Sequence, residues 1–227
     1  MMDTGQEELH NKVYRRLIAA PVVVGLMLFV PAGSLSWWQG WLYMGVIFVP
    51  LVVAVAYFLN NDPGLLERRM KMREKEGEQK RIVLLSSVIF LAGFLLPGLD
   101  YRFGWSEVPV ALVLAADAMV FLGYLITFLT LRENSFASRI IEVEVGQQVI
   151  STGPYAIVRH PMYAGVILML LFTPLALGSS LALVAFVPLA VLIVLRIRNE
   201  ETVLARELPG YLEYCGKVRY RLVPGIW

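Results

Sequence analysis

Residues 108–131 read VPVALVLAADAMVFLGYLITFLTL, an apolar run in which Asp117 is the only charged side chain. A helix needs about 20 apolar residues to cross the hydrocarbon core of a bilayer, so this run predicts a membrane-spanning helix. The chain of 227 residues is 58% hydrophobic and 17% charged, whereas soluble domains carry roughly 25% charged residues. The composition therefore indicates a helical membrane protein and argues against a soluble domain.

Further apolar runs extend this pattern along the chain. They cover residues 17–35, 41–59, 82–99, 162–177 and 181–195. The last two are short for a bilayer and are separated only by Gly178, Ser179 and Ser180, which predicts a tight antiparallel hairpin or one re-entrant unit. We expect an all-α fold, a bundle of about six transmembrane helices. It divides into N-terminal spans, residues 1–131, and a C-terminal region, residues 132–227, with the hairpin and a cytoplasmic tail.

The basic residues predict the orientation of this bundle. Of the 20 Lys and Arg residues, only Arg102 falls in a loop on one side of a six-span arrangement. Basic residues concentrate in cytoplasmic loops, so we expect both termini in the cytoplasm. The mixed charges of residues 71–81 predict a solvated loop on that side. The first apolar run is longer than the apolar core of a signal peptide and lacks a clear cleavage site, so we interpret it as a span.

Several kinds of site are excluded by composition. Cys215 is the single cysteine, which rules out a disulfide framework and a cysteine-rich metal site. Two histidines are too few for a multi-histidine metal centre, and we expect no metal. The net charge of +2 gives no indication of nucleic-acid binding. The chain carries no dinucleotide-binding, Walker-type or nucleophile-elbow motif.

Two polar clusters flank the last hairpin. The first is GPYAIVRHPMYAG, residues 153–165, and the second is RIRNEE, residues 196–201. The second helix of a hairpin ends beside the start of the first helix. Arg159 and His160 should therefore lie near Arg196, Glu200 and Glu201. A site with both cations and anions at a membrane boundary suits a zwitterionic, water-soluble cofactor.

The start of the fifth apolar run favours binding of an anion. Pro161 in the first helical turn needs no partner for a backbone N–H. The free N–H groups of that turn, together with the helix dipole, favour a carboxylate. Arg159 adds a positive charge, and Gly165 leaves room for a neighbouring helix or a ligand. Each feature alone also fits a helix cap, a membrane anchor or a surface ion pair, but together across one hairpin they favour a site.

The same residues resemble a known family. The run Gly153–Gly165, the pattern Arg196-x-Arg198-x-Glu200-Glu201 and the tail Tyr211-Leu212-Glu213-Tyr214 look like the isoprenylcysteine carboxyl methyltransferase family. These integral membrane enzymes are related to the phospholipid methyltransferases. The segment Leu131–Phe136 also resembles the family's sequence ahead of its cofactor region, and the resemblance covers roughly residues 130–227. Thr202 follows the paired glutamates, where eukaryotic members of the family have a longer acidic run.

The resemblance implies S-adenosylmethionine as cofactor, bound at the cytoplasmic face. The residues expected to bind it are Gly153, Pro154, Tyr155, His160, Pro161, Tyr163, Gly165, Glu200, Tyr211 and Tyr214. It also implies methyl transfer to the carboxylate of an isoprenylcysteine or a similar lipid-linked acceptor, whose tail enters from the bilayer. We expect Arg159 and Arg196 to orient that carboxylate and Glu201 to hold one of the two guanidinium groups.

Other functions stay open at this stage. An amine-bearing phospholipid as acceptor needs a base, a role that Glu201 or Tyr163 can fill. A non-enzymatic membrane module or a small transporter is a further alternative, but transporters usually carry polar or broken helices at mid-membrane. The polar residues of this chain gather at one face instead. Asp117, within a predicted span, is either a structural hydrogen-bond partner or a functional group.

Overall fold

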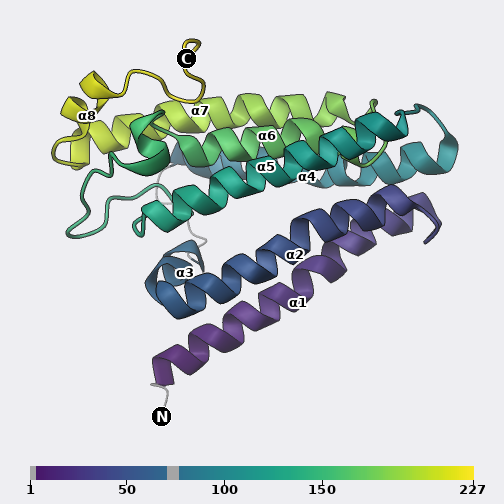
Figure 1. Ribbon diagram of the computed structural model, residues 1–227, viewed down its shortest axis with the longest axis horizontal. Coiled ribbons are helices and arrows are strands. Elements are labelled where there is room, and N and C mark those ends of the chain that lie inside the picture. Colours follow the sequence, from purple (N-terminus) through teal and green to yellow (C-terminus); the bar gives the residue numbers. More distant parts are fainter. Residues whose placement is uncertain (1–3, 71–76) are drawn as a thin grey trace.

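The computed structural model is all-helical over the residues that it describes, 4–70 and 77–227. Its long helices run side by side along the longest dimension of the molecule (Figure 1). They are α1 (Thr4–Ala32), α2 (Trp38–Asn61), α4 (Gly77–Phe103), α5 (Val110–Glu133), α6 (Pro161–Ala176) and α7 (Leu183–Glu207). The short helices α3 (Pro63–Met70), η1 (Gly153–Ala156) and α8 (Tyr211–Lys217) lie at one end of the bundle, which we call the site end.

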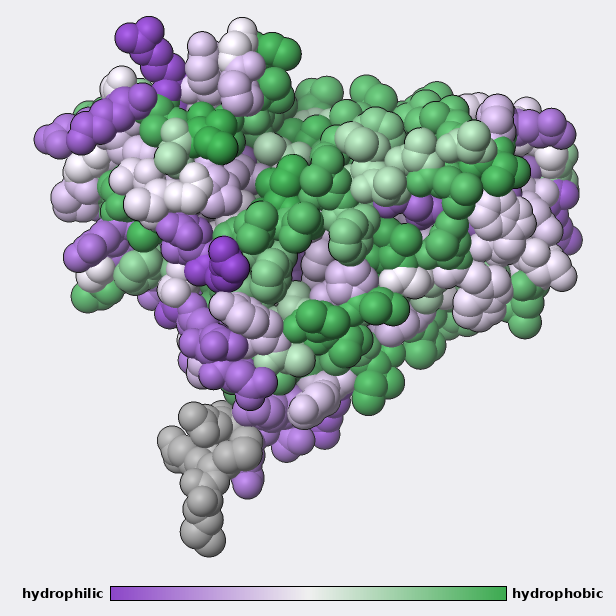
Figure 2. Space-filling view, viewed as in Figure 1, coloured by the Kyte–Doolittle hydropathy of each residue, from purple (hydrophilic) through white to green (hydrophobic). Residues whose placement is uncertain are grey.

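The predicted all-α membrane fold is confirmed. Each predicted apolar run forms a helix, and four of these helices, α1, α2, α4 and α5, are long and apolar enough to cross a bilayer. Helix α6 is apolar but shorter. Figure 2 shows an apolar surface across the middle of the molecule, between more polar ends. Whether α6 and α7 also cross the membrane, and which end faces the cytoplasm, stay predictions.

The last hairpin differs from its predicted form. Helix α7 continues without a break to Glu207, so the second polar cluster lies within a helix and not after one. The prediction ended at Leu195 because the apolar run ends there, but charged residues are good helix formers once the helix leaves the hydrocarbon. The link between α6 and α7 covers residues 177–182 and is longer than the predicted turn. The Ser179 hydroxyl accepts a hydrogen bond from the Ala182 N–H at 3.1 Å and shapes this link.

The connection after α2 contains structure that the sequence pattern does not predict. Helix α3 forms within it, and Leu65 of α3 is fully buried. Asp62 caps this helix by accepting a hydrogen bond from the Leu65 N–H at 2.9 Å. The charged loop predicted for residues 71–81 lies mostly outside the described residues.

Two facing glycines allow α5 and α6 to pack closely. A Cβ atom on Gly165 would lie 2.5 Å from the carbonyl oxygen of Gly123 and 2.6 Å from Thr127 Oγ1. Small residues let helix backbones approach each other, a common arrangement where helices pack in membranes. Helix α5 therefore holds α6 directly. The predicted division of the chain at residue 131 falls inside α5 and stays a prediction.

Two buried carboxyl groups differ sharply in their surroundings. Asp100, at the end of the bundle opposite the site end, is 1% exposed and accepts hydrogen bonds from the N–H and hydroxyl groups of Ser106 at 2.7 and 2.6 Å. The Ser179 hydroxyl also donates to Asp100, which ties α4 to the link between α6 and α7. Asp117 in α5 is 4% exposed, and its oxygens have no hydrogen-bond partner among the described residues. The structural hydrogen bond considered for Asp117 is therefore not found among the described residues.

We expect Gly165→Ala to destabilise the protein by about 1–3 kcal/mol, the usual cost of overpacking a dense contact. The measurement is the thermal midpoint of the purified protein in detergent. Gly45→Ala is the matched control, because a Cβ atom at Gly45 meets nothing within 4 Å. An unchanged thermal midpoint for Gly165→Ala would contradict the close packing of α5 on α6.

Candidate active site

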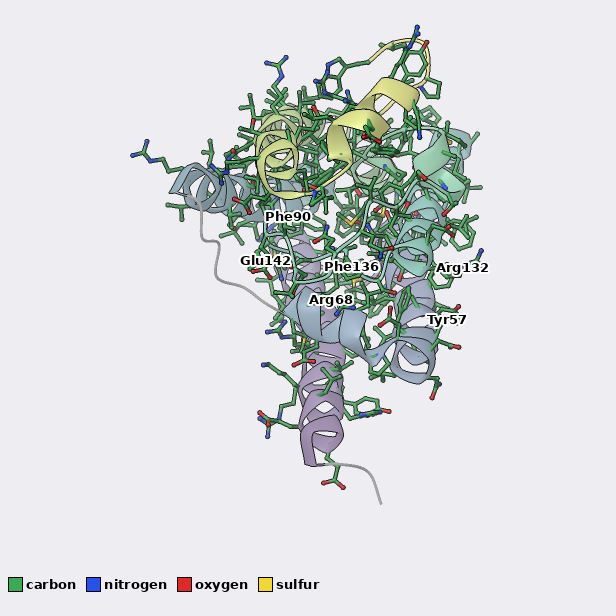
Figure 3. The ribbon with its side chains drawn as sticks, turned by 90° about the vertical axis from the view of Figure 1, so that its left-hand side faces the viewer. Tyr57, Arg68, Phe90, Arg132, Phe136 and Glu142 are labelled. Carbon is green, nitrogen blue, oxygen red and sulfur yellow. The ribbon has the colours of Figure 1, made fainter. Side chains whose placement is uncertain are left out.

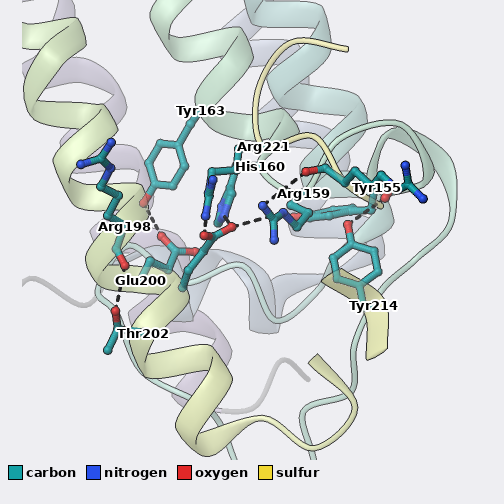
Figure 4. Close-up of polar contacts among 11 residues, drawn as sticks. Tyr155, Arg159, His160, Tyr163, Arg198, Glu200, Thr202, Tyr214 and Arg221 are labelled. Atoms are coloured by element: carbon teal, nitrogen blue, oxygen red, sulfur yellow. Dashed lines mark hydrogen bonds and ion pairs between the residues drawn. The ribbon is translucent and has the colours of Figure 1, made fainter. Parts of the chain in front are cut away.

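The two polar clusters meet at the site end. Tyr163, in the first turn of α6, donates a hydrogen bond to Glu200 Oε2 of α7 at 2.6 Å. His160, the residue before α6, has its Nε2 atom 3.2 Å from Glu201 Oε1. Figure 4 shows these contacts crossing from the start of α6 to the polar end of α7. The prediction that the hairpin brings the two clusters together is confirmed.

One face of α7 lines a pocket at this end of the bundle. Arg196, Glu200 and Leu204 are four residues apart, so their side chains lie on the same side of the helix, and all three line the pocket. Arg196 Nε donates to Tyr163 Oη at 3.0 Å, and Arg196 Nη2 donates to the Arg139 carbonyl at 2.7 Å. The Tyr163 hydroxyl therefore accepts from a cation and donates to an anion, which fixes both side chains.

Glu201 joins the start of α6 to the C-terminal tail. Its Oε1 atom lies 3.2 Å from His160 Nε2 and 3.2 Å from Arg159 Nε, and its Oε2 atom accepts a hydrogen bond from Arg221 Nε at 2.7 Å. The Arg159 contact is an ion pair by distance and lacks the angles of a hydrogen bond. The backbone N–H groups of Arg159 and His160 donate to the carbonyls of Tyr220 and Arg221, each at 2.9 Å. The tail is thus docked by charges and by backbone hydrogen bonds.

These contacts determine the ionisation of Glu201, whose side chain is 12% exposed. Burial raises the pKa of this carboxyl, but hydrogen bonds from His160 and Arg221 and the charge of Arg159 lower it by more. The net effect is a pKa below the ordinary value. Glu201 is therefore an ionised anchor at neutral pH and a weak base.

The pocket contains most of the residues predicted to form the site. Its lining includes Tyr155, Arg159, His160, Tyr163, Arg196, Glu200, Tyr211 and Tyr214. Asn134 donates to Tyr155 Oη at 3.0 Å, and the Tyr214 hydroxyl donates to the Tyr155 carbonyl at 2.7 Å. Burial raises the pKa of Tyr155 to about 12, so its phenol is neutral at physiological pH. These contacts connect η1, α8 and the end of α5 around one wall.

The remaining predicted residues do not line the pocket. Gly153 and Pro154 are in η1, Pro161 is the first residue of α6, Gly165 packs against α5, and Glu201 anchors the tail. Gly153 has a φ of 55°, and a Cβ atom there would lie 2.9 Å from Glu133 Cδ, so this position needs glycine for both reasons. Of the two roles predicted for Gly165, the structure shows the contact with a neighbouring helix.

One wall of the pocket was not predicted. It is formed by Phe136, Ala137, Ser138, Ile140, Ile141, Glu142, Gln147, Gln148, Val149 and Ile150. Residues 141–145 alternate apolar and acidic side chains as a strand does, but they form no strand, and the pattern gives no indication of a ligand site. Leu204 is also missing from the prediction, although it lies one turn beyond Glu200 on α7. Arg221 had no local signal, because its partner Glu201 is 20 residues away in the sequence.

The donor set of the pocket fits S-adenosylmethionine. Tyr211 Oη is buried at the pocket and has no hydrogen-bond partner among the described residues. An unpaired buried hydroxyl costs about 1–3 kcal/mol, so a polar ligand group at this place would remove a penalty. Burial, and next the charge of Glu201, raise the pKa of Tyr211, so its phenol stays a donor. With Gln147, Gln148 and Glu200 on the lining, the pocket offers partners for carboxylate, ammonium and ribose hydroxyl groups. No group of His, Cys, Asp or Glu in the described part of the chain is placed to hold a metal ion.

The fold and the pocket define an integral membrane protein with a polar ligand site at one end of a helical bundle. Residues 110–206 match the model of the isoprenylcysteine carboxyl methyltransferase (ICMT) family. The fold is similar to the solved structure of the eukaryotic intramembrane Ras methyltransferase ICMT, with a TM-score of 0.54 and 18% sequence identity, over 90% of this chain and 74% of that chain. The family-model match supports assignment to the isoprenylcysteine carboxyl methyltransferase family, and the structural similarity shows a shared fold.

A second similarity is to another kind of enzyme, a reductase. The chain is 33% identical over 90 residues to Delta(14)-sterol reductase TM7SF2 of Mus musculus. This match covers 38% of the chain and only 22% of the mouse protein. The ICMT family match begins before the predicted start near residue 130 and ends at residue 206, so Tyr211 and Tyr214 lie outside it.

We expect Glu201→Gln to destabilise the protein by about 1.5–3 kcal/mol at pH 7, because charge-assisted hydrogen bonds become neutral ones. A carboxyl with a lowered folded-state pKa adds stability above its unfolded pKa, and this stability is lost as the pH falls through the folded value. The difference in thermal midpoint between wild type and variant should therefore be full at pH 7 and shrink below the ordinary pKa of 4.5. The exposed Glu213, replaced by Gln, is the control and should change little. A difference that does not vary with pH would contradict the ion-pair role of Glu201.

Proposed function

We propose that this protein is a membrane methyltransferase that uses S-adenosylmethionine to esterify the carboxylate of an isoprenylcysteine or a similar lipid-linked acceptor. The observation that carries the proposal is where the family match falls. Residues 110–206 include Tyr163, Arg196 and Glu200, the side chains that contact one another across the pocket.

The reaction requires positioning more than acid–base chemistry. Bound S-adenosylmethionine supplies an electrophilic methyl group. A carboxylate is already ionised at neutral pH and needs no base. Arg196, held by the Tyr163 hydroxyl and the Arg139 carbonyl, presents a fixed guanidinium for that carboxylate. Alignment of two reactants can lower a barrier by ~7–11 kcal/mol.

Different parts of the pocket are suited to the two reactants. Tyr211, whose hydroxyl has no hydrogen-bond partner in the described part of the chain, lines the pocket together with Tyr155 and Tyr214. We place the cofactor at this wall, which is the one nearest the tail. Arg196 lies on the other side of Tyr163, toward the segment that contains Arg139, where we place the acceptor carboxylate. Arg159 is engaged by Glu201, so it supports the tail side of the pocket and adds positive charge there.

The surroundings of the two base candidates favour a carboxylate over an amine as acceptor. Removal of a proton from an amine needs a base with free lone pairs and a pKa near neutrality. Glu201 is surrounded by His160, Arg159 and Arg221, and its pKa is lowered. Tyr163 has its proton directed to Glu200. Neither group is suited to take a proton from an ethanolamine lipid.

The similarity to a sterol reductase supports a second candidate function, the reduction of a lipid double bond. Such a reaction needs a hydride donor, for example a reduced nicotinamide, in place of a methyl donor. The same pocket would then hold a dinucleotide. This candidate rests on 90 matched residues, whereas the methyltransferase fold extends over 90% of the chain.

The test is incubation of the purified protein with methyl-labelled S-adenosylmethionine and one acceptor at a time. The acceptors are S-farnesylcysteine with a blocked amino group, phosphatidylethanolamine and farnesoic acid. We expect label on farnesylcysteine in a form that base releases, as for a methyl ester. Label on the ethanolamine lipid that resists base would indicate N-methylation. No label on any acceptor, together with oxidation of reduced nicotinamide by a sterol substrate, would indicate the reductase.

We expect Arg196→Gln and Arg196→Lys both to lower turnover of farnesylcysteine at least ~10-fold while cofactor affinity changes little. The reason is that the planar guanidinium of Arg matches the two oxygens of a carboxylate, whereas the ammonium of Lys is only a point charge. The measurement is kcat together with cofactor binding by calorimetry and the thermal midpoint. A membrane anchor would accept Lys equally well. If Arg196→Lys turns over at the wild-type rate, Arg196 is an anchor and not a carboxylate clamp.

A further inference from the structure

Helix α3 brings a residue of the N-terminal half into contact with residues that line the pocket, although it is not itself part of the lining. Arg69, near the end of α3, has its Nη1 atom 3.4 Å from the Ser138 carbonyl oxygen and 3.4 Å from Met162 Sδ. Both Ser138 and Met162 line the pocket. The Arg69 guanidinium therefore stands directly behind the unpredicted wall, although it comes from a helix that lies outside the family match.

The charges around Arg69 favour an anion. Two other cations, Arg139 and Arg196, lie close enough to repel the charge of Arg69. The acids on the pocket lining are Glu142 and Glu200, and Glu200 accepts the Tyr163 hydroxyl. Three arginines therefore lie near one another at this wall. An added carboxylate would lower their mutual repulsion and match the fork of a guanidinium.

An apolar region begins next to these cations. Leu65 of α3 is buried against Phe58 of α2, and Ala137 packs on the same cluster while also lining the pocket. Phe136 lines the pocket as well, and the Arg68 guanidinium lies 5.9 Å from the centroid of its ring. Figure 3, a view onto the site end, shows Arg68 and Phe136 close together beside α3. Cations and an apolar surface therefore adjoin at the ends of two spanning helices, α2 and α5.

We infer that Arg69 binds the acceptor carboxylate together with Arg196, and that α3 and the apolar cluster beside it select acceptors in which a carboxylate is joined to an apolar tail. The inference rests on the proposed function and extends it, because it gives α3 a role in acceptor recognition. The contact of Arg69 with Ser138 and Met162 places its guanidinium where the tail of such an acceptor would meet its head group. A neutral head group would gain nothing from these cations.

The test compares two ligands that differ only in charge. S-Farnesylcysteine with a blocked amino group and its carboxamide are titrated into the purified full-length protein, saturated with S-adenosylhomocysteine, by calorimetry. Wild type should bind the carboxylate at least ~10-fold more tightly than the amide, since a charge-assisted hydrogen bond is worth about 1.5–3 kcal/mol. Arg69→Gln should lose most of this preference and keep its affinity for S-adenosylhomocysteine. Arg69→Lys should recover part of it.

Arg68→Gln is the matched control on the same helix. Arg68 docks α3 through the Ser135 carbonyl, at 2.7 Å from its Nε atom, and Ser135 does not line the pocket, unlike the Arg69 partners Ser138 and Met162. Its replacement should weaken both ligands equally or leave both unchanged. If Arg69→Gln behaves in the same way, Arg69 only docks α3 and the inference is overturned. Binding of neither S-adenosylhomocysteine nor the acceptor by wild type would instead count against the proposed function itself.

Discussion

The geometry of the site depends on the ion pairs of one ionised carboxylate, that of Glu201. It contacts His160 before α6, Arg159 beside it and Arg221 in the tail. A carboxylate in this partly buried position is stable only if it is paired, and the available partners come from segments far apart in the sequence. Satisfying one charge therefore fixes how α6, α7 and the tail meet. The pocket walls contributed by Tyr211 and Tyr214 follow from that docking.

Helix α7 connects the docked tail to the apolar part of the bundle. Its first half is apolar and packs against α4 and α6, and its second half presents Arg196, Glu200 and Leu204 to the pocket. Because the helix is unbroken, these side chains keep a fixed depth relative to the apolar bundle. The facing glycines of α5 and α6 hold these two helices together through a close backbone contact that no larger residue allows. A rigid site at a fixed depth suits a ligand with one group in water and a tail in lipid.

The parts of this structure that could be predicted from sequence are those set by local composition. Apolar runs predicted the helices, and the two charged clusters predicted that the hairpin would bring His160 near Glu201. The hydrogen bond of Tyr163 with Glu200 follows from the same hairpin, but this pairing was not predicted. The predicted end of α7 was wrong, because hydropathy shows where an apolar run ends and not where the helix ends. The wall of residues 136–150 and the approach of Arg69 depend on contacts between segments distant in sequence. Such contacts leave no pattern in a single sequence.

The residues in and around the site lie partly inside and partly outside the family match. Tyr163, Arg196, Glu200 and Glu201 lie inside residues 110–206, and they make the central ion pairs and hydrogen bonds of the pocket. Arg69, on α3, and Tyr211, in the tail, lie outside and approach from opposite sides. These two flanking walls differ in chemistry. The Tyr211 hydroxyl has no hydrogen-bond partner among the described residues, and Arg69 lies beside an apolar cluster. That arrangement makes α3 and the tail the elements whose exchange would change specificity while the central contacts remain.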